Sequence, residues 1–114
     1  MAKESYVVRG NISNVADCIV KGFRDSGISC ELVERVDRRS NGVTATTLVF
    51  EKYMWRAGNR ASLTVMLFSG GDSVYVDAIG SGGGTGVFFS FSWGAEDALV
   101  STVKDILRGA GYLS

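Results

Sequence analysis

The fold is decided by residues 41–79, which read NGVTATTLVFEKYMWRAGNRASLTVMLFSGGDSVYVDAI. Three β-rich runs, 43–56, 61–69 and 74–79, follow turn signals at 37–42, 57–60 and 70–73. The first turn ends in Asn41-Gly42, a pair that tolerates the positive φ angles of tight hairpins. Turn signals at this regular spacing between β-rich runs predict an antiparallel meander.

A helix is predicted on each side of this meander. The first follows a short strand at Ser5–Arg9, is capped by Asn11 or Ser13, and stops at Gly27. Its apolar face has the i, i+3, i+4, i+7 spacing of an amphipathic helix. That face consists of Ile12, Val15, Ala16, Ile19, Val20 and Phe23. The second helix has an apolar face made of Ala95, Leu99, Val103, Ile106 and Leu107, and it ends at Gly109 or Gly111.

Between the first helix and the meander, the hydrophobic period changes to two. Alternation predicts a strand with one face made of Ile28, Cys30, Leu32, Glu34 and Val36, while a helical reading stays open. The order β-α-β-β-β-β-α predicts a two-layer α+β sandwich, in which an antiparallel meander sheet carries both helices on one face. One domain over residues 1–114 is expected, and an extra strand at 87–92 is an open alternative.

Composition narrows the function classes. The 114 residues contain no histidine, so imidazole bases, Ser-His or Cys-His nucleophile pairs and histidine-containing metal sites are excluded. We expect no catalytic residues, cofactor or metal. Twelve basic residues balance twelve acidic ones, which argues against nucleic-acid binding. With two cysteines, no signal peptide and no long apolar run, we expect a cytoplasmic protein without a membrane partner.

The remaining reactive side chains have simpler interpretations. Cys18 flanks the apolar face of the first predicted helix, and Cys30 alternates in phase with Ile28 and Leu32. We interpret both as small buried hydrophobic residues. Asp77 and Glu51 sit within apolar strands and read as residues of a solvated strand face. An enzyme would need one of these carboxylates in a pocket beside a second titratable group.

The predicted sheet has apolar side chains on both faces. In run 43–56, Leu48 and Phe50 alternate with Val49 and Tyr53, although a sheet covered on one side should be polar on the other. Cover from the same chain, β-bulges, a partner subunit or a ligand would each explain the second apolar face. For a self-associating protein, the predicted interface consists of Val49, Tyr53, Trp55, Met66 and Phe68.

A glycine-rich stretch at 80–86 follows the meander. Walker A and GxGxxG spacings both fail there, so a surface loop is the simpler interpretation. Because turns of a meander alternate between its two ends, this stretch lies at the end that holds Arg56 and Arg60, opposite Arg38-Arg39. Guanidinium groups and free amides suit a small anionic ligand. Its predicted site consists of Arg56, Arg60, Gly82, Gly83, Gly84 and Thr85.

The Gly80-Ser81-Gly82-Gly83-Gly84 run leads to an aromatic stretch and a final helix that begins Trp93-Gly94-Ala95-Glu96. With its size and element order, the chain resembles a family of small bacterial proteins classified only as a domain of unknown function. The resemblance implies no activity. We therefore expect a non-enzymatic cytoplasmic binding module that self-associates through an apolar sheet face, the alternative being a binding protein for a small anionic ligand.

Overall fold

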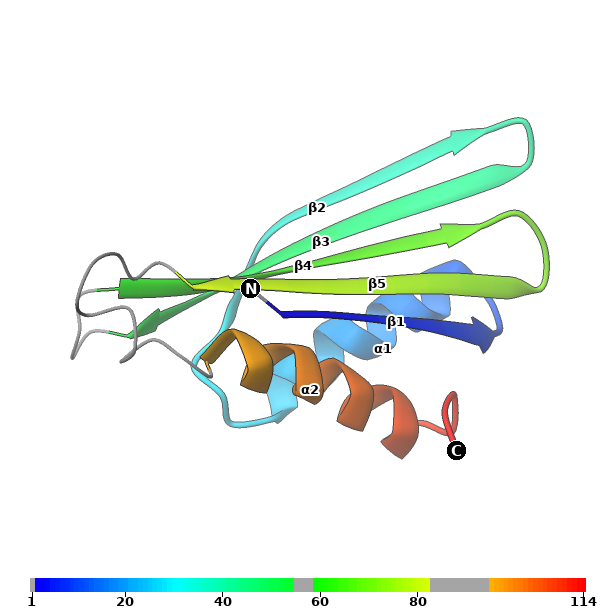
Figure 1. The fold of residues 1–114 in the computed structure, drawn as a ribbon. Helices are drawn as coiled ribbons and strands as arrows, with labels where there is room; N and C mark the ends of the chain where they lie inside the picture. The colour runs from blue at the N-terminus through cyan, green and yellow to red at the C-terminus, as the bar shows by residue number, and fades with distance from the viewer. Residues whose placement is uncertain (1, 55–58, 83–94) are drawn as a thin grey trace.

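The structure, a computed structural model, describes residues 2–54, 59–82 and 95–114 (Figure 1). The elements in chain order are β1 (Ala2–Arg9), α1 (Ile12–Asp25), β2 (Glu31–Ser40), β3 (Val43–Met54), β4 (Asn59–Ser69), β5 (Ser73–Gly82) and α2 (Ala95–Gly109). The strands form one antiparallel sheet in the order β1-β5-β4-β3-β2. The predicted α+β class and element order are confirmed, and the alternative strand at 87–92 lies outside the described residues.

The Asn41-Gly42 turn sets the register of the β2–β3 hairpin. Asn41 has φ 51° and Gly42 has φ 80°, as a two-residue hairpin turn requires. Ser40 then pairs with Val43, and each further pair keeps the same register as far as Glu34 and Val49. The Asn41-Gly42 turn chemistry read from the sequence is confirmed, but the predicted turn at 37–42 was too long, because residues 37–40 pair with β3 as part of β2.

Both helices cover the same face of the sheet, which we call the inner face (Figure 1). Asn11 caps α1 through its side-chain oxygen, which accepts from the backbone N–H of Ser13 at 2.9 Å and of Asn14 at 3.2 Å. Phe23 of α1 stacks on Phe50 of β3 with ring centroids 4.6 Å apart. The helices bury Val15, Ala16, Ile19, Phe23, Leu99, Val100, Val103 and Leu107 against this face.

The strand prediction for 28–36 was wrong at two points. β2 begins at Glu31, and its pairing with β3 shifts between Leu32 and Glu34, where Val33 has no partner. This bulge reverses the alternation, so Leu32 pairs with Phe50 on the inner face while Glu34 and Val36 lie on the opposite, outer face. Single-strand periodicity could not reveal the bulge, because the extra residue is defined only relative to β3.

The last strand is longer than predicted. Residues 80–82 continue β5, where Gly80 pairs with Ala2 and Leu63 and Gly82 pairs with Ala61. Backbone pairing with β4, and at Gly80 also with β1, outweighs the low strand propensity of glycine.

The two helices make a close contact at Gly22. A Cβ atom built there would lie 2.6 Å from Cγ2 of Ile106 on α2, far inside van der Waals contact. Gly22 is therefore required by helix packing rather than by backbone conformation.

We expect Gly22→Ala to lower the free energy of unfolding by about 1–3 kcal/mol, because the added methyl group overpacks the α1–α2 contact. An exposed helical glycine normally gains about 0.5–1 kcal/mol from the same change. Gly109→Ala is the matched control, since no atom lies within 4 Å of its added Cβ. Urea unfolding of both variants measures the difference. Equal stabilisation of the two would contradict the close contact, and Ile106→Ala should rescue Gly22→Ala.

Candidate functional site

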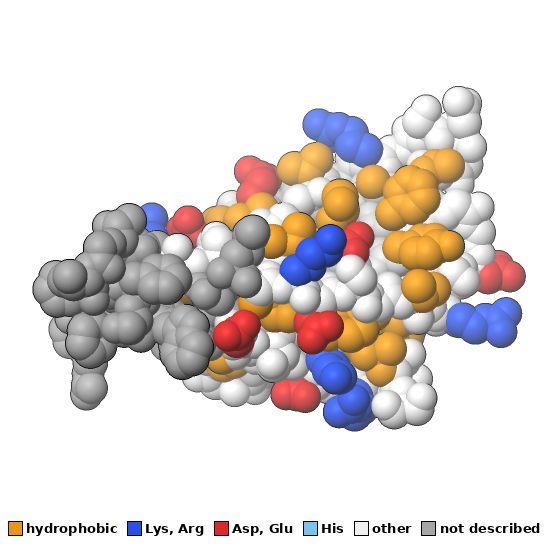
Figure 2. All heavy atoms as spheres, viewed as in Figure 1, with side chains coloured by type: hydrophobic (Ala, Val, Ile, Leu, Met, Phe, Trp, Pro, Cys, Tyr) orange, Lys and Arg blue, Asp and Glu red, His pale blue; other side chains and the backbone are white. Residues whose placement is uncertain are grey.

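The outer face carries a row of exposed apolar side chains that runs from the edge strand β1 through β5 to β4 (Figure 2). Val7, Tyr75 and Phe68 are neighbours in the pairing register of β1, β5 and β4, and they are 58%, 51% and 46% exposed. The rings of Phe68 and Tyr75 are 6.3 Å apart. Met66, two residues before Phe68, is 44% exposed. We call these four residues the apolar stripe.

The stripe contains part of the predicted interface. Met66 and Phe68 belong to it, and Val49 lies half-buried on the same face. Tyr53 follows in β3, but its side chain, like Trp55 as a whole, lies outside what the structure describes. The prediction missed Val7 and Tyr75. Val7 alternates with Tyr6 and Val8 along β1 and so lies on the opposite face from them, but only the sheet order brings β1 beside β5.

The predicted anion site lies at the end of the sheet where β5 stops, and the charges of the described residues there are not predominantly basic. Arg60 and Gly82 do lie at this end, because Ala61, next to Arg60, pairs with Gly82. The Arg60 guanidinium lies 3.5 Å from the carboxylate of Glu51. A cleft of about 510 Å³ beside them is lined by Ile28, Ser29, Cys30, Glu31, Glu51 and Arg60. Two carboxylates thus face one guanidinium among the described lining residues.

Four residues of the predicted anion site, Arg56, Gly83, Gly84 and Thr85, lie outside the described residues. Gly82 is part of β5 rather than of a loop. The anion site stays a prediction.

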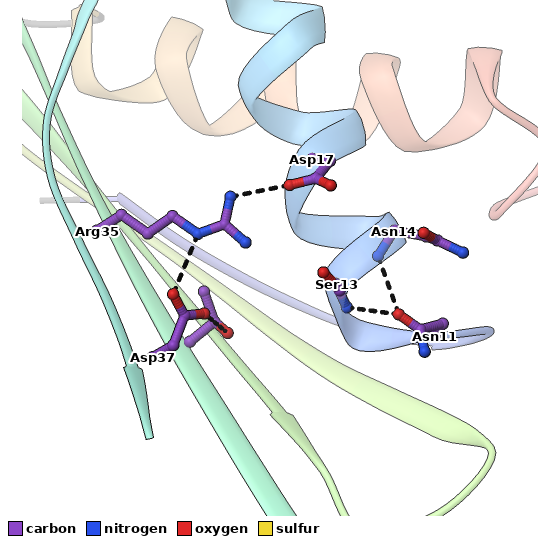
Figure 3. A network of polar contacts seen from close by, with 7 residues as sticks. Asn11, Ser13, Asn14, Asp17, Arg35 and Asp37 are labelled. Carbon is purple, nitrogen blue, oxygen red and sulfur yellow. Dashed lines mark hydrogen bonds and ion pairs between the residues drawn. The ribbon is translucent and has the colours of Figure 1, made fainter. Parts of the chain in front are cut away.

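A second polar cluster lies on the inner face, where β2 passes α1 (Figure 3). Arg35 donates from Nη1 to Asp17 of α1 at 2.9 Å and from Nε to Asp37 at 3.4 Å. Asp37 accepts from the hydroxyl of Thr46 on β3 at 2.7 Å. Hydrogen bonding to Asp17 is the main reason that the pKa of Arg35 is raised. The chain Thr46–Asp37–Arg35–Asp17 joins β3, β2 and α1, and we call it the polar strap.

A cleft of about 400 Å³ opens beside the polar strap. Its lining consists of Ile12, Ser13, Arg35, Asp37, Arg38, Arg39, Thr44 and Thr46. Arg35 already donates to two carboxylates, so its first role is to hold the edge strand against α1. Sequence reasoning missed this cluster because Asp17 and Arg35 are 18 positions apart and Asp37 was assigned to a turn.

Of the other reactive groups, Cys30 lines the cleft beside Glu51, so a thiol and a carboxylate share that cleft, whereas Cys18 and Asp77 line neither of the two clefts described above. Burial raises the pKa of the Cys18 and Cys30 thiols, which disfavours the thiolate. Asp77 accepts from the hydroxyl of Ser5 at 2.6 Å on the outer face. Within the described ranges, no group of three or more metal-ligating side chains comes together. Neither helix there has the length and apolar content to cross a bilayer.

These features define an α+β protein whose five-stranded sheet is covered by helices on one face and bears exposed aromatic residues on the other. The chain belongs to the family of unknown function DUF6054, whose sequence model matches residues 1–111. The predicted family resemblance is confirmed.

No curated protein matches the chain. Among solved structures, the chain is similar to TTHA0849 from Thermus thermophilus, with 12% sequence identity and a TM-score of 0.36. The match covers 95% of this chain and 92% of that one. A likeness at this TM-score carries no argument about function.

We expect Asp37→Ala to lower the free energy of unfolding by about 1–3 kcal/mol, because the hydroxyl of Thr46, which is 1% exposed, loses its acceptor. Thr46→Val is the matched change, since it removes the hydroxyl and leaves Asp37 accessible to water. In the Thr46→Val background, Asp37→Ala should therefore destabilise less. A double-mutant cycle by urea unfolding measures the coupling, and purely additive effects would contradict the polar strap.

Proposed function

We propose that this protein is a non-enzymatic binding module that self-associates by packing the outer faces of two sheets together. The observation that carries the proposal is the apolar stripe, in which two aromatic rings and two aliphatic side chains are each about half exposed. Aromatic residues and methionine are enriched at the centres of protein interfaces. Three of the four stripe residues are of these types, and with Val7 they form an exposed apolar patch of the kind that marks an interaction site.

The outer face approaches the size that a stable dimer needs. Five strands spaced about 4.8 Å apart make a sheet about 24 Å wide, and the eight residues of β1 span about 26 Å at about 3.3 Å each. The flat outline is therefore about 600 Å², before the relief of the side chains is counted. A standard interface buries about 800 Å² on each partner.

Two properties of the chain favour a second copy as the occupant. The formal net charge is zero, so two copies do not repel each other at long range. The stripe runs from β1 at one edge of the sheet to β4 at its centre, with Lys3 and Arg9 beside it on β1 and Glu34 and Arg38 on β2. An apolar patch bordered by both charges suits a two-fold interface, in which the same patch meets itself.

The further parts of the proposal rest on the composition and on the cysteines. The lack of histidine in the sequence supports a non-enzymatic role, because it removes the commonest acid-base side chain at neutral pH. Cys18 and Cys30 are unpaired thiols, which favours a reducing compartment such as the cytoplasm.

We expect the double variant Phe68→Thr/Tyr75→Thr to lose outer-face association. Threonine keeps the strand propensity while both rings are removed, and central aromatic residues each contribute about 2 kcal/mol or more to an interface. The dissociation constant of this contact should rise at least about 100-fold. Sedimentation equilibrium at high micromolar concentration should show a clear fall in the average mass.

The matched control is Ser101→Glu, an exposed residue of α2 in the opposite layer, which should leave the mass unchanged. Unfolding curves establish that each variant is folded. An unsubstituted protein that sediments at 12.2 kDa over the whole concentration range would refute self-association. An unchanged mass in the double variant would refute the outer face as its interface.

A further inference from the structure

β2 forms one edge of the sheet, and the hairpin turn decides which of its backbone groups face outward (Figure 1). In a two-residue hairpin, the pair next to the turn is hydrogen-bonded and the following pairs alternate. Ser40, Arg38 and Val36 therefore bond to β3, while the N–H and C=O groups of Arg35 and Asp37 point to the free edge.

Side chains of β2 itself cover two of these outward groups. The backbone N–H of Arg35 donates to the Glu34 carboxylate at 3.1 Å. The backbone C=O of Asp37 accepts from Nη1 of Arg38 at 3.1 Å. These are donor and acceptor groups that a neighbouring antiparallel strand would pair, and charged side chains take the place of that strand in a single chain.

The charges along β2 are complementary to themselves in one register. In two-fold antiparallel pairing centred on Val36, Glu34 lies opposite Arg38 of the second copy, and Arg35 lies opposite Asp37 of the second copy. Two-fold symmetry repeats both pairs, so all four charged pairs join opposite signs. The hydrogen-bonding pattern also agrees, because Arg35 and Asp37 then exchange their outward N–H and C=O groups.

The neighbouring registers bring like charges together. If the two-fold axis lay at Arg35, the two Arg35 guanidinium groups would face each other. If it lay at Asp37, the two Asp37 carboxylates would face each other, and Arg35 would lie opposite Arg39 of the second copy. The bulge at Val33 interrupts regular pairing on the other side of Glu34. Charged residues on an edge strand disfavour non-specific pairing with other strands. In β2 their order leaves one register in which opposite charges of the two copies face each other.

We propose that β2 pairs with β2 of a second copy about a two-fold axis at Val36, which joins two sheets into one continuous sheet. Glu34 and Arg38 release the backbone groups that they cover and pair with each other across the axis. This interface uses the edge of the sheet and leaves the apolar stripe uncovered, so it does not depend on the proposed outer-face contact.

Cysteine cross-linking tests the register. Val36→Cys is made in a Cys18→Ser/Cys30→Ser background, so that the new thiol is the only one. Val36 meets its own copy in a non-hydrogen-bonded pair with Cα atoms about 4.5 Å apart, within disulfide range. We expect mild oxidation to give a covalent dimer in high yield. Ser40→Cys is the control on the same strand, because the two copies of residue 40 lie eight positions apart and should not cross-link.

Charge exchange tests the pairing without a disulfide. It is made in the Phe68→Thr/Tyr75→Thr background, where outer-face association is removed and the edge contact is measured alone. Arg38→Glu should weaken the remaining dimer at least about tenfold, because it places a second carboxylate opposite Glu34 of the second copy. Adding Glu34→Arg should restore the affinity, because opposite charges again face each other.

Three outcomes would overturn the edge interface. They are a monomer at high micromolar concentration in the outer-face background, equal cross-linking at positions 36 and 40, and a charge-exchanged variant no tighter than Arg38→Glu alone. Unfolding curves confirm that each variant is folded. Absence of the edge contact together with outer-face association would refute this inference alone. Absence of outer-face association together with the edge contact would refute only the proposed function.

Discussion

The apolar inner face of the five strands is shielded from water where α1 and α2 pack on it. Most of the structure follows from that burial. The helices bring Phe23 and Leu107 onto strand residues such as Leu48, Val65 and Val76, all essentially inaccessible. Close approach of α1 to α2 at Gly22 makes this cover continuous. Because both helices are used on one side, the other side keeps its own side chains exposed, and the apolar stripe is the result.

The edge of the sheet depends on polar contacts instead. β2 carries six charged residues among its ten and has no row of inward apolar residues to pack under a helix. Arg35 bridges Asp17 and Asp37, and Thr46 completes the contact from β3. The same charges that fasten β2 to α1 also determine how its free edge can meet another strand. Fold stability and the proposed self-recognition therefore share residues at this edge.

Sequence patterns predicted the elements well and the sites in part. Periods of 3.6 and 2, with turn residues such as Asn41-Gly42, are local signals, and they predicted the order of helices and strands. Met66 and Phe68 were placed on the exposed face because alternation within one strand is also local. The bulge at Val33 and the partnership of β1 with β5 were missed, since both are defined between strands distant in the chain.

What the sequence by itself determined is the alternation of side chains within each element and the chemistry of each turn, because both arise from neighbours along the chain. Only the tertiary structure decided which alternating face lies under the helices. It also placed Val7 and Tyr75 beside Phe68, joined Asp17 to Arg35, and left β2 at an edge. These outcomes depend on contacts between residues far apart in sequence, which no local pattern encodes.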